Sequence, residues 1–167
     1  MKIQRIKKII DGPARYPTID VLEDQIVLYF SKKNDEGKSR VFQVSLDKDK
    51  PWLILEQPRQ TSLELGLPGS FDQHGHAARC IISTQDRKFM YLMGWSHVSS
   101  SFPPYHLSIG FAEWIRDKWV KIDGPVMDRG TSNPFFASSP SVLFDRDRYK
   151  MWYISCNGWE MGSRPIQ

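Results

Sequence analysis

A repeat with a period of about 62 residues constrains the fold of this chain more than any other feature. Three segments, at 19–30, 80–92 and 142–153, each combine an apolar run, a charged turn and a second apolar run with an aromatic residue near its end. This pattern is typical of a β-hairpin. Tyr29, Tyr91 and Tyr153 hold equivalent places in the three segments, and both intervals between them are 62 residues. A constant interval indicates an array of similar structural units.

The first two copies of the repeat continue into two further predicted strands each. In the first copy these lie at 40–46 and near 52–55, and in the second at 107–112 and 119–122. Residues 111–119 also have the length of a short helix, but Arg116-Asp117-Lys118 resembles the other charged turns, so we predict strand, turn and strand. Four antiparallel strands in a unit of about 60 residues are typical of a β-propeller blade. The predicted fold class is therefore all-β.

The third copy contains only its first hairpin before a polar tail. We therefore predict a single partial propeller domain over residues 1–167, with about two and a half blades of a five-bladed architecture. Repeat 1 covers about 11–66, repeat 2 about 67–128 and the incomplete repeat 3 about 129–160. An open array leaves strand edges exposed, so we expect a piece of a longer protein, two chains that complete each other, or a poorly stable product. Self-association through the open blade edges is expected for the same reason.

Composition and charge narrow the classes of function. Eleven Gly, eleven Pro and 13% aromatic residues favour strands and turns over long helices. The net charge is +4, but basic residues alternate with acids, as at 145–148, so we expect no nucleic-acid surface. We find no signal peptide and no apolar run of transmembrane length, and we expect a cytoplasmic protein without a membrane partner. The two cysteines, Cys80 and Cys156, do not make a disulfide framework.

Candidate catalytic residues precede the first strand of each predicted unit. Such residues are expected to ring the mouth of a central channel, which makes a concave site. Asp11, Asp72 and Asn133 are spaced by 61 residues in both intervals. Acids from separate blades are what a glycosidase needs, so we predict Asp72 and then Asp11 as catalytic acids. Each also stands in a turn-like sequence, so a structural role is the alternative for both.

Candidate carbohydrate-binding residues surround these acids. His74 and His76 are candidates to orient Asp72, to contact sugar hydroxyls or to bind a metal. The motif Asp-x-His-x-His contains too few ligands for a metal site, so we predict no metal and no cofactor. Arg15 and Arg79 are candidates to reach a carboxylate or phosphate of a ligand, with a plain salt bridge as the alternative. Aromatic rings stack on sugars or pack between blades. The predicted set is His74, His76, Arg79, Trp95, Tyr105, His106, Asn133 and Trp159.

Several short motifs, in order along the chain, resemble a known family. They include Gly69-Ser70-Phe71-Asp72-Gln73-His74-Gly75, Met90-Tyr91-Leu92-Met93-Gly94-Trp95, Pro104-Tyr105-His106, and Lys150-Met151-Trp152-Tyr153 with Gly158-Trp159. The chain resembles the five-bladed β-propeller superfamily of glycoside hydrolases, which contains arabinanases, β-xylosidases, invertases and levansucrases. It is similar in particular to glycosyl-hydrolase-like proteins of bacterial polysaccharide gene clusters, and it looks like an N-terminal fragment of one.

The chain departs from that family at two of its usual acidic positions. The enzymes carry an aspartate before a proline in the first blade, where this chain has Tyr16 before Pro17. Relatives tend to carry an acid before a proline-aromatic pair in the third blade, where this chain has Asn133. The resemblance implies a propeller that acts on or binds a carbohydrate, and if it is an enzyme, a glycosidase. The alternatives are a glycan-binding module without catalysis and a scaffold without a ligand.

Overall fold

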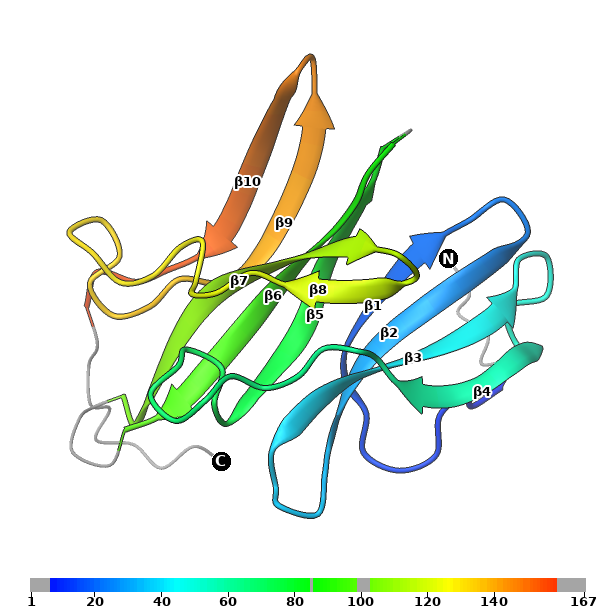
Figure 1. Ribbon diagram of the computed structural model, residues 1–167, viewed down its shortest axis with the longest axis horizontal. Coiled ribbons are helices and arrows are strands. Elements are labelled where there is room, and N and C mark those ends of the chain that lie inside the picture. The colour runs from blue at the N-terminus through cyan, green and yellow to red at the C-terminus, as the bar shows by residue number, and fades with distance from the viewer. Residues whose placement is uncertain (1–6, 85, 99–102, 159–167) are drawn as a thin grey trace, which may run out of the picture.

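The computed structural model describes residues 7–84, 86–98 and 103–158, and the regular structure within these ranges is entirely β (Figure 1). The predicted all-β class is confirmed for these residues. A first antiparallel meander contains β1 (Arg15–Val21), β2 (Gln25–Lys33), β3 (Ser39–Asp47) and β4 (Ile54–Gln60). A second contains β5 (Gly75–Ser83), β6 (Lys88–His97), β7 (Tyr105–Ile115) and β8 (Lys118–Lys121). A separate hairpin contains β9 (Ser138–Asp145) and β10 (Arg148–Ile154).

The first eight strands form one mixed sheet, because β3 and β5 pair in parallel. That pairing consists of a single residue pair, Ser39 with Gly75. The Ser39 N–H donates to the carbonyl oxygen of His74 at 3.3 Å. The sheet is therefore two four-stranded antiparallel units joined at one point. We name β1–β4 the first unit, β5–β8 the second unit and β9–β10 the third hairpin.

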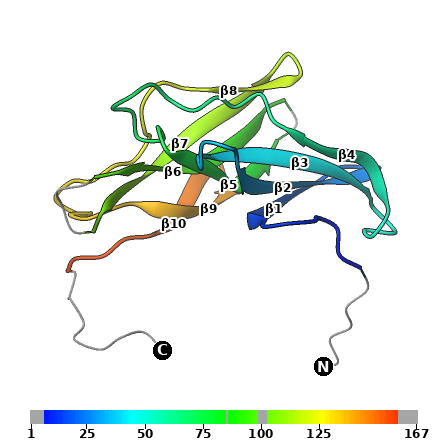
Figure 2. The same cartoon turned by 90° about the horizontal axis from the view of Figure 1, so that it is seen from below.

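The first strands of the three parts lie next to one another, and the period of the sequence reappears in their contacts. The Thr18 hydroxyl donates to the Arg79 carbonyl oxygen at 3.5 Å, across 61 residues. The backbone N–H of Val142 donates to Cys80 Sγ at 3.3 Å, across 62 residues. Figure 2 shows the result from the side, with β8 on the upper side of the molecule and the third hairpin on the lower side. Equivalent residues of successive copies therefore meet between the parts.

The hydrophobic core lies between these parts. The largest cluster joins β2, β3, β5, β6, β7 and β8 and contains Val27, Tyr29, Val41, Leu63, Ala78, Met90, Leu92, Ala112 and Trp119. A smaller cluster, centred on Ile82, Phe89 and Val142, joins the second unit to the third hairpin. Each part thus buries a face against the next, which is the main favourable contribution to folding. The equivalent tyrosines differ in burial: Tyr29, in the first unit, is 2% exposed, and Tyr153, in the third hairpin, is 37% exposed.

Two of the hairpin turns, β7–β8 and β9–β10, have the same backbone conformation. Arg116 and Asp117 have φ of 48° and 62°, and Arg146 and Asp147 have φ of 46° and 68°. Two successive left-handed residues define the type I′ turn, whose twist matches that of antiparallel strands. The prediction of strand, turn and strand at 111–119 is confirmed. The Gly94-Trp95 pair, which the hairpin pattern predicts to follow the second strand of its unit, lies instead inside β6.

Candidate functional site

Each first strand contains an irregularity at the same place in the repeat. The pairing register shifts at Tyr16-Pro17 in β1, at Arg79 in β5 and opposite Ser139-Pro140 in β9. A β-bulge re-aims the side chains at the position where it occurs and is common next to binding sites. The three bulges therefore turn equivalent residues of three neighbouring strands away from the regular alternation.

Tyr16 and Ser139 also have unusual backbone angles. Their φ values are 55° and 49°, in the left-handed region that residues with a β-carbon seldom adopt. Each of them precedes a proline, which restricts its backbone further. A residue in such a conformation costs on the order of 1–3 kcal/mol, and such residues cluster at ligand sites. Both of them line the same cavity.

That cavity, which we name the bulge cavity, has a volume of about 480 Å³. Its lining combines aromatic rings, basic side chains and small residues from β1, β2, β6, β7 and β9. They are Arg15, Tyr16, Lys33, Gly37, Met93, Trp95, His97, Tyr105, Leu107 and Ser139. A smaller cavity of about 140 Å³ shares Arg15, Tyr16, Lys33 and Trp95 with it, so we treat the two as one site. The volume is in the range of small-molecule sites.

Trp95 and Tyr16 form the aromatic wall of the bulge cavity. Their rings meet edge to face, with centroids 6.3 Å apart. The indole lies directly on Gly75, because a β-carbon there would be 2.4 Å from its Cζ2 atom. Tyr16 has a second neighbour, Arg79, whose guanidinium carbon lies 5.4 Å from the centre of the Tyr16 ring. Tyr16 is thus held by an indole and by a cation.

Two histidines lie at the same site. The backbone N–H of His97 donates to Nδ1 of His74 at 3.0 Å, so a neutral His74 carries its proton on Nε2. The two rings pack edge to face at 4.9 Å. Partial burial lowers the pKa of His74, and the neighbouring charges of His97 and Lys38 lower it further. His97 lines the bulge cavity, and His74 contacts the site through it.

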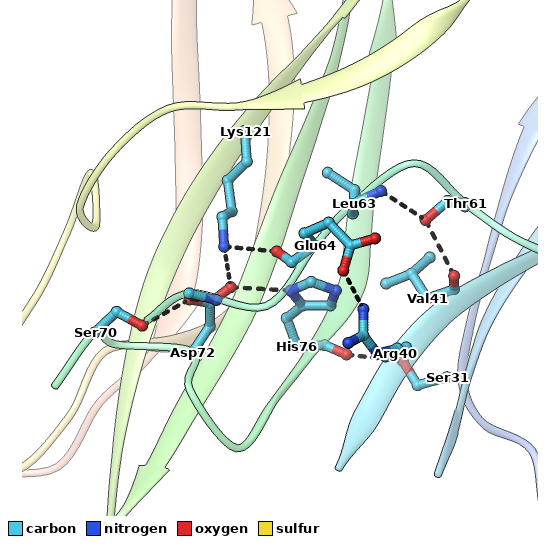
Figure 3. Close-up of polar contacts among 11 residues, drawn as sticks. Ser31, Arg40, Val41, Thr61, Leu63, Glu64, Ser70, Asp72, His76 and Lys121 are labelled. Atoms are coloured by element: carbon cyan, nitrogen blue, oxygen red, sulfur yellow. Dashed lines mark hydrogen bonds and ion pairs between the residues drawn. The ribbon is translucent and has the colours of Figure 1, made fainter. Parts of the chain in front are cut away.

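Asp72 lies in a different environment. It belongs to the segment that precedes β5 in the chain and takes part in a buried polar network (Figure 3). Its side chain is 0% exposed. Oδ2 accepts a hydrogen bond from Nδ1 of His76 at 2.9 Å and forms an ion pair with Nζ of Lys121. Oδ1 accepts from the Gly66 N–H at 3.1 Å and from the Ser70 hydroxyl at 3.3 Å. All the strong acceptor positions of the carboxylate are therefore used within the chain.

The charges in this network follow from its geometry. Burial raises the pKa of Asp72, but the hydrogen bonds from His76 and Lys121 outweigh burial, and the net shift of this pKa is downward. Burial also lowers the pKa of His76, against the opposing effect of Asp72. At neutral pH Asp72 is thus an anion, Lys121 a cation and His76 a neutral ring that donates its Nδ1–H.

Phe71 holds the segment that carries Asp72 against the second unit. Its ring fills the space above two glycines of neighbouring strands, because a β-carbon on Gly94 or Gly110 would lie 2.4 or 2.5 Å from ring atoms. The Lys121 ammonium lies 5.6 Å from the centre of the same ring. It also donates to the backbone carbonyl of Glu64 at 2.9 Å. The network therefore ties the connection between the two units to β8.

The structure separates the two predicted catalytic acids. Asp72 does not line the bulge cavity, and neither does Asp11. The Asp11 side chain is 98% exposed and pairs with Lys8 at 3.1 Å. It lines another cavity, of about 290 Å³, together with Phe30 and Phe42. A catalytic role for either acid is untested and stays a prediction.

The other predicted residues are distributed over several places. Trp95 and Tyr105 line the bulge cavity, and Arg79 contacts it through Tyr16. His106 lines a separate cavity of about 320 Å³, and burial lowers its pKa. Asn133 is buried in a turn, where its Oδ1 atom accepts a hydrogen bond from the Tyr153 hydroxyl at 3.0 Å. Trp159 lies outside the described residues. The binding roles of these residues are likewise untested.

Sequence reasoning missed Lys33, His97 and Ser139 as members of the site. The sequence does contain one sign of the two bulged residues Tyr16 and Ser139. Each precedes a proline, and the two X-Pro pairs are about two repeats apart. Among the described lining residues of the bulge cavity none is an aspartate or glutamate. The described part of the chain contains no group of three or more His, Cys, Asp or Glu placed to hold a metal ion. Nor does that part contain a helix suited to crossing a membrane.

Comparison with family models gives no match. The chain is 29% identical over 158 residues to two proteins of Mycobacterium tuberculosis, Uncharacterized protein Rv1502 and Uncharacterized protein MT1551. Each alignment covers 92% of this chain and 52% of the relative. The chain therefore spans about half the length of the curated relatives that it matches.

Among solved structures, the α-L-arabinofuranosidase of Lactobacillus brevis superimposes with a TM-score of 0.67 and 15% sequence identity. The match covers 97% of this chain and 51% of that enzyme. A second structure, described as a glycoside hydrolase, matches with a TM-score of 0.57 and 14% identity, over 84% of this chain and 47% of the other. At this level of identity the likeness concerns the fold alone. The fold of this chain therefore resembles that of glycoside hydrolases, over about half their length.

Proposed function

We propose that this chain is the N-terminal part of a glycoside-hydrolase-like five-bladed β-propeller whose bulge cavity binds a carbohydrate. The architecture is supported by two four-stranded meanders and a third hairpin at one sequence period, with their first strands side by side. In a propeller, blades pack face to face around an axis that the first strands line. About two and a half blades, matched to about half of a solved glycoside hydrolase, give five in the whole.

One observation carries the functional proposal: Tyr16 and Ser139, from the bulges of the first strands β1 and β9, line a single cavity together with Trp95 of β6 and Tyr105 of β7. Trp95 and Tyr105 offer apolar ring faces with a polar group at the edge, which suits the C–H face and hydroxyl rim of a sugar. The Ser139 hydroxyl and His97 add hydrogen-bonding groups at the same site. In the proposed propeller, the part of the cavity that β1 and β9 line would lie at the mouth of the channel.

We propose binding, not hydrolysis, for this part of the protein. Glycosidases of the common type place two carboxylates across the scissile bond, about 5–10 Å apart. The described lining of the bulge cavity contains no carboxylate, and Asp72 is occupied by His76 and Lys121. Glycosidase activity in a longer protein would need acids from residues beyond this lining. The resemblance in fold to glycoside hydrolases is the support for glycosidase activity in a longer protein.

Replacement of Trp95 with alanine tests the site. We expect this variant to lose about tenfold or more in affinity for a glycan that the unmodified chain binds, because an aromatic anchor of the pocket is removed. The glycan is first selected on a glycan array, and affinities are then measured by titration calorimetry. Trp52→Ala is the matched control, because Trp52 is 40% exposed and lies outside the cavity lining. Equal loss in both variants, or no glycan binding by the unmodified chain, contradicts the proposal.

The exposed surface of the third hairpin yields a second test of the architecture. Leu143, Phe144, Trp152 and Ile154 are between 45% and 58% exposed there. Within the described residues β10 pairs only with β9, so its other edge is open. We propose that further strands of a longer polypeptide cover this surface, and that the 167-residue chain alone self-associates through it. Light scattering after size exclusion is expected to show dimers or larger species that Trp152→Lys reduces. A folded monomer at all concentrations contradicts this proposal.

A further inference from the structure

We infer that the bulge cavity selects a sugar that carries an anionic group, either a carboxylate or a phosphate. This inference rests on the proposed carbohydrate-binding function and adds the charge of the ligand to it. Arg15 and Lys33 both line the large and the small part of the cavity. Within the described residues, no side chain forms a hydrogen bond or an ion pair with either of them. Two cations thus face the same space without a compensating partner.

The acids that lie near these cations in the sequence do not line the cavity. Asp and Glu are absent from the described lining of both parts of the cavity. Glu36, in the turn that also contributes Gly37 to the lining, pairs with Lys38 at 3.1 Å. Asp11, four residues before Arg15, pairs with Lys8 and lines a different cavity. The positive charge of the site is therefore not neutralised by the described groups around it.

Arg79 adds a third positive charge at the wall. Its guanidinium lies over the Tyr16 ring, and that ring lines both parts of the cavity. Its Nε atom is buried and has no hydrogen-bond partner within the described residues. A concave site with cations and apolar walls concentrates the electrostatic potential and favours an anion. Arg79 is the bulged residue of β5, and its guanidinium reaches the site through the Tyr16 ring.

The kind of group that fits these cations follows from their chemistry. A guanidinium presents parallel N–H donors that match the two oxygens of a carboxylate or phosphate, and an ammonium adds a point charge. Trp95 and Tyr105 then supply flat surfaces for the ring that bears the anion. Uronic acids and sugar phosphates share this combination of a pyranose or furanose ring with one anionic group.

Titration with charged and neutral sugars tests the inference. The probes are trigalacturonic acid, galactotriose as its uncharged counterpart, and glucose 1-phosphate. We expect the 167-residue chain to bind one or both anionic probes at least about tenfold more tightly than galactotriose, since hydrogen bonds to charged groups are stronger than those between neutral groups. We expect this preference to shrink as NaCl is raised, because salt screens exposed charges. The double variant Arg15→Gln/Lys33→Gln is expected to lose the preference, so that it binds the anionic probes no more tightly than galactotriose.

Lys32→Gln is the matched control for the double variant. Lys32 is an exposed neighbour of Lys33 on β2, and it lines the cavity that contains Asp11. Successive strand residues point to opposite faces, so this change alters the net charge without touching the bulge cavity. Equal affinity for acidic and neutral probes, or an equal effect of the control and the double variant, overturns the inference and leaves the proposed function standing. Failure of all three probes and of the glycan array overturns both. Preference for only one anionic probe supports the inference and identifies the group.

Discussion

Replacement of Asp72 with alanine is expected to destabilise the folded chain by about 3 kcal/mol, because it leaves a partly buried cation and a buried histidine without their acceptor. The Lys121 side chain is 16% exposed, and the His76 side chain is 0% exposed. Without Asp72, the Nδ1–H of His76 and the N–H of Gly66 also lose their acceptor. Urea unfolding followed by circular dichroism measures the effect as a lower midpoint with a similar slope.

Two further variants separate this structural role from a general effect of charge. Asp11→Ala removes an acid that is 98% exposed and that, among the described residues, pairs with Lys8 alone, so we expect a change within about 0.5 kcal/mol. The Asp72→Ala/Lys121→Met double variant removes both charges and is expected to be more stable than Asp72→Ala alone. An Asp72→Ala chain that unfolds at the same urea concentration as the unmodified chain would show that the network contributes little. Asp72 would then be open again to a role as a catalytic acid.

Much of the fold was predictable because it depends on local patterns. The apolar alternation and the charged turns at 22–24, 116–117 and 146–147 define hairpins before any tertiary contact forms. The 62-residue interval between Tyr29, Tyr91 and Tyr153 then requires the same hairpin three times. The parallel pair of Ser39 with Gly75 was not predictable in this way, because a single bridge between distant strands leaves no pattern in the sequence.

The candidate site was only partly predictable, and the physical reason lies in the bulges. The interval of 61 residues placed Asp11, Asp72 and Asn133 at equivalent positions, but those positions precede the strands by several residues. The residues of the first strands β1 and β9 that reach the cavity include instead the bulged residues Tyr16 and Ser139. A bulge adds one residue and redirects its neighbours, so repeat spacing alone does not tell which of several adjacent residues faces the cavity.

The burial of Asp72 shows a second limit of sequence reasoning. From the sequence, an acid in a turn, such as Asp72, is expected to be exposed in a loop. It is buried because Phe71, its neighbour, occupies the hollow that Gly94 and Gly110 leave on the second unit, and because Lys121 reaches it from β8. Neither glycine has a backbone angle that requires glycine. Gly94 and Gly110 leave space for the Phe71 ring, and this is visible only once β6 and β7 are placed side by side.

Gly94→Ala is expected to destabilise the chain by about 1–3 kcal/mol, because overpacking a filled site forces side chains or backbone to move. The new β-carbon would lie 2.4 Å from two Phe71 ring atoms and 2.8 Å from Cβ of Asp72. Phe71 is the neighbour of Asp72, so we expect a shift of this segment that makes room for the β-carbon to weaken the ion pair between Asp72 and Lys121 as well. Thermal and urea unfolding, compared with the unmodified chain, measure the sum.

Gly130→Ala is the matched control, because a β-carbon at Gly130 meets no atom within 4 Å, and we expect its effect to stay within about 0.5 kcal/mol. A double-mutant cycle with Phe71→Ala identifies the cause. If the ring is the obstacle, Gly94→Ala costs less when Phe71 is already alanine, and the two changes combine with less than additive loss. Additive effects, or equal stability of the Gly94 and Gly130 variants, would mean that the second unit does not depend on this ring. The segment from Gly66 to His76 would then be held in place by the polar contacts of Asp72 alone.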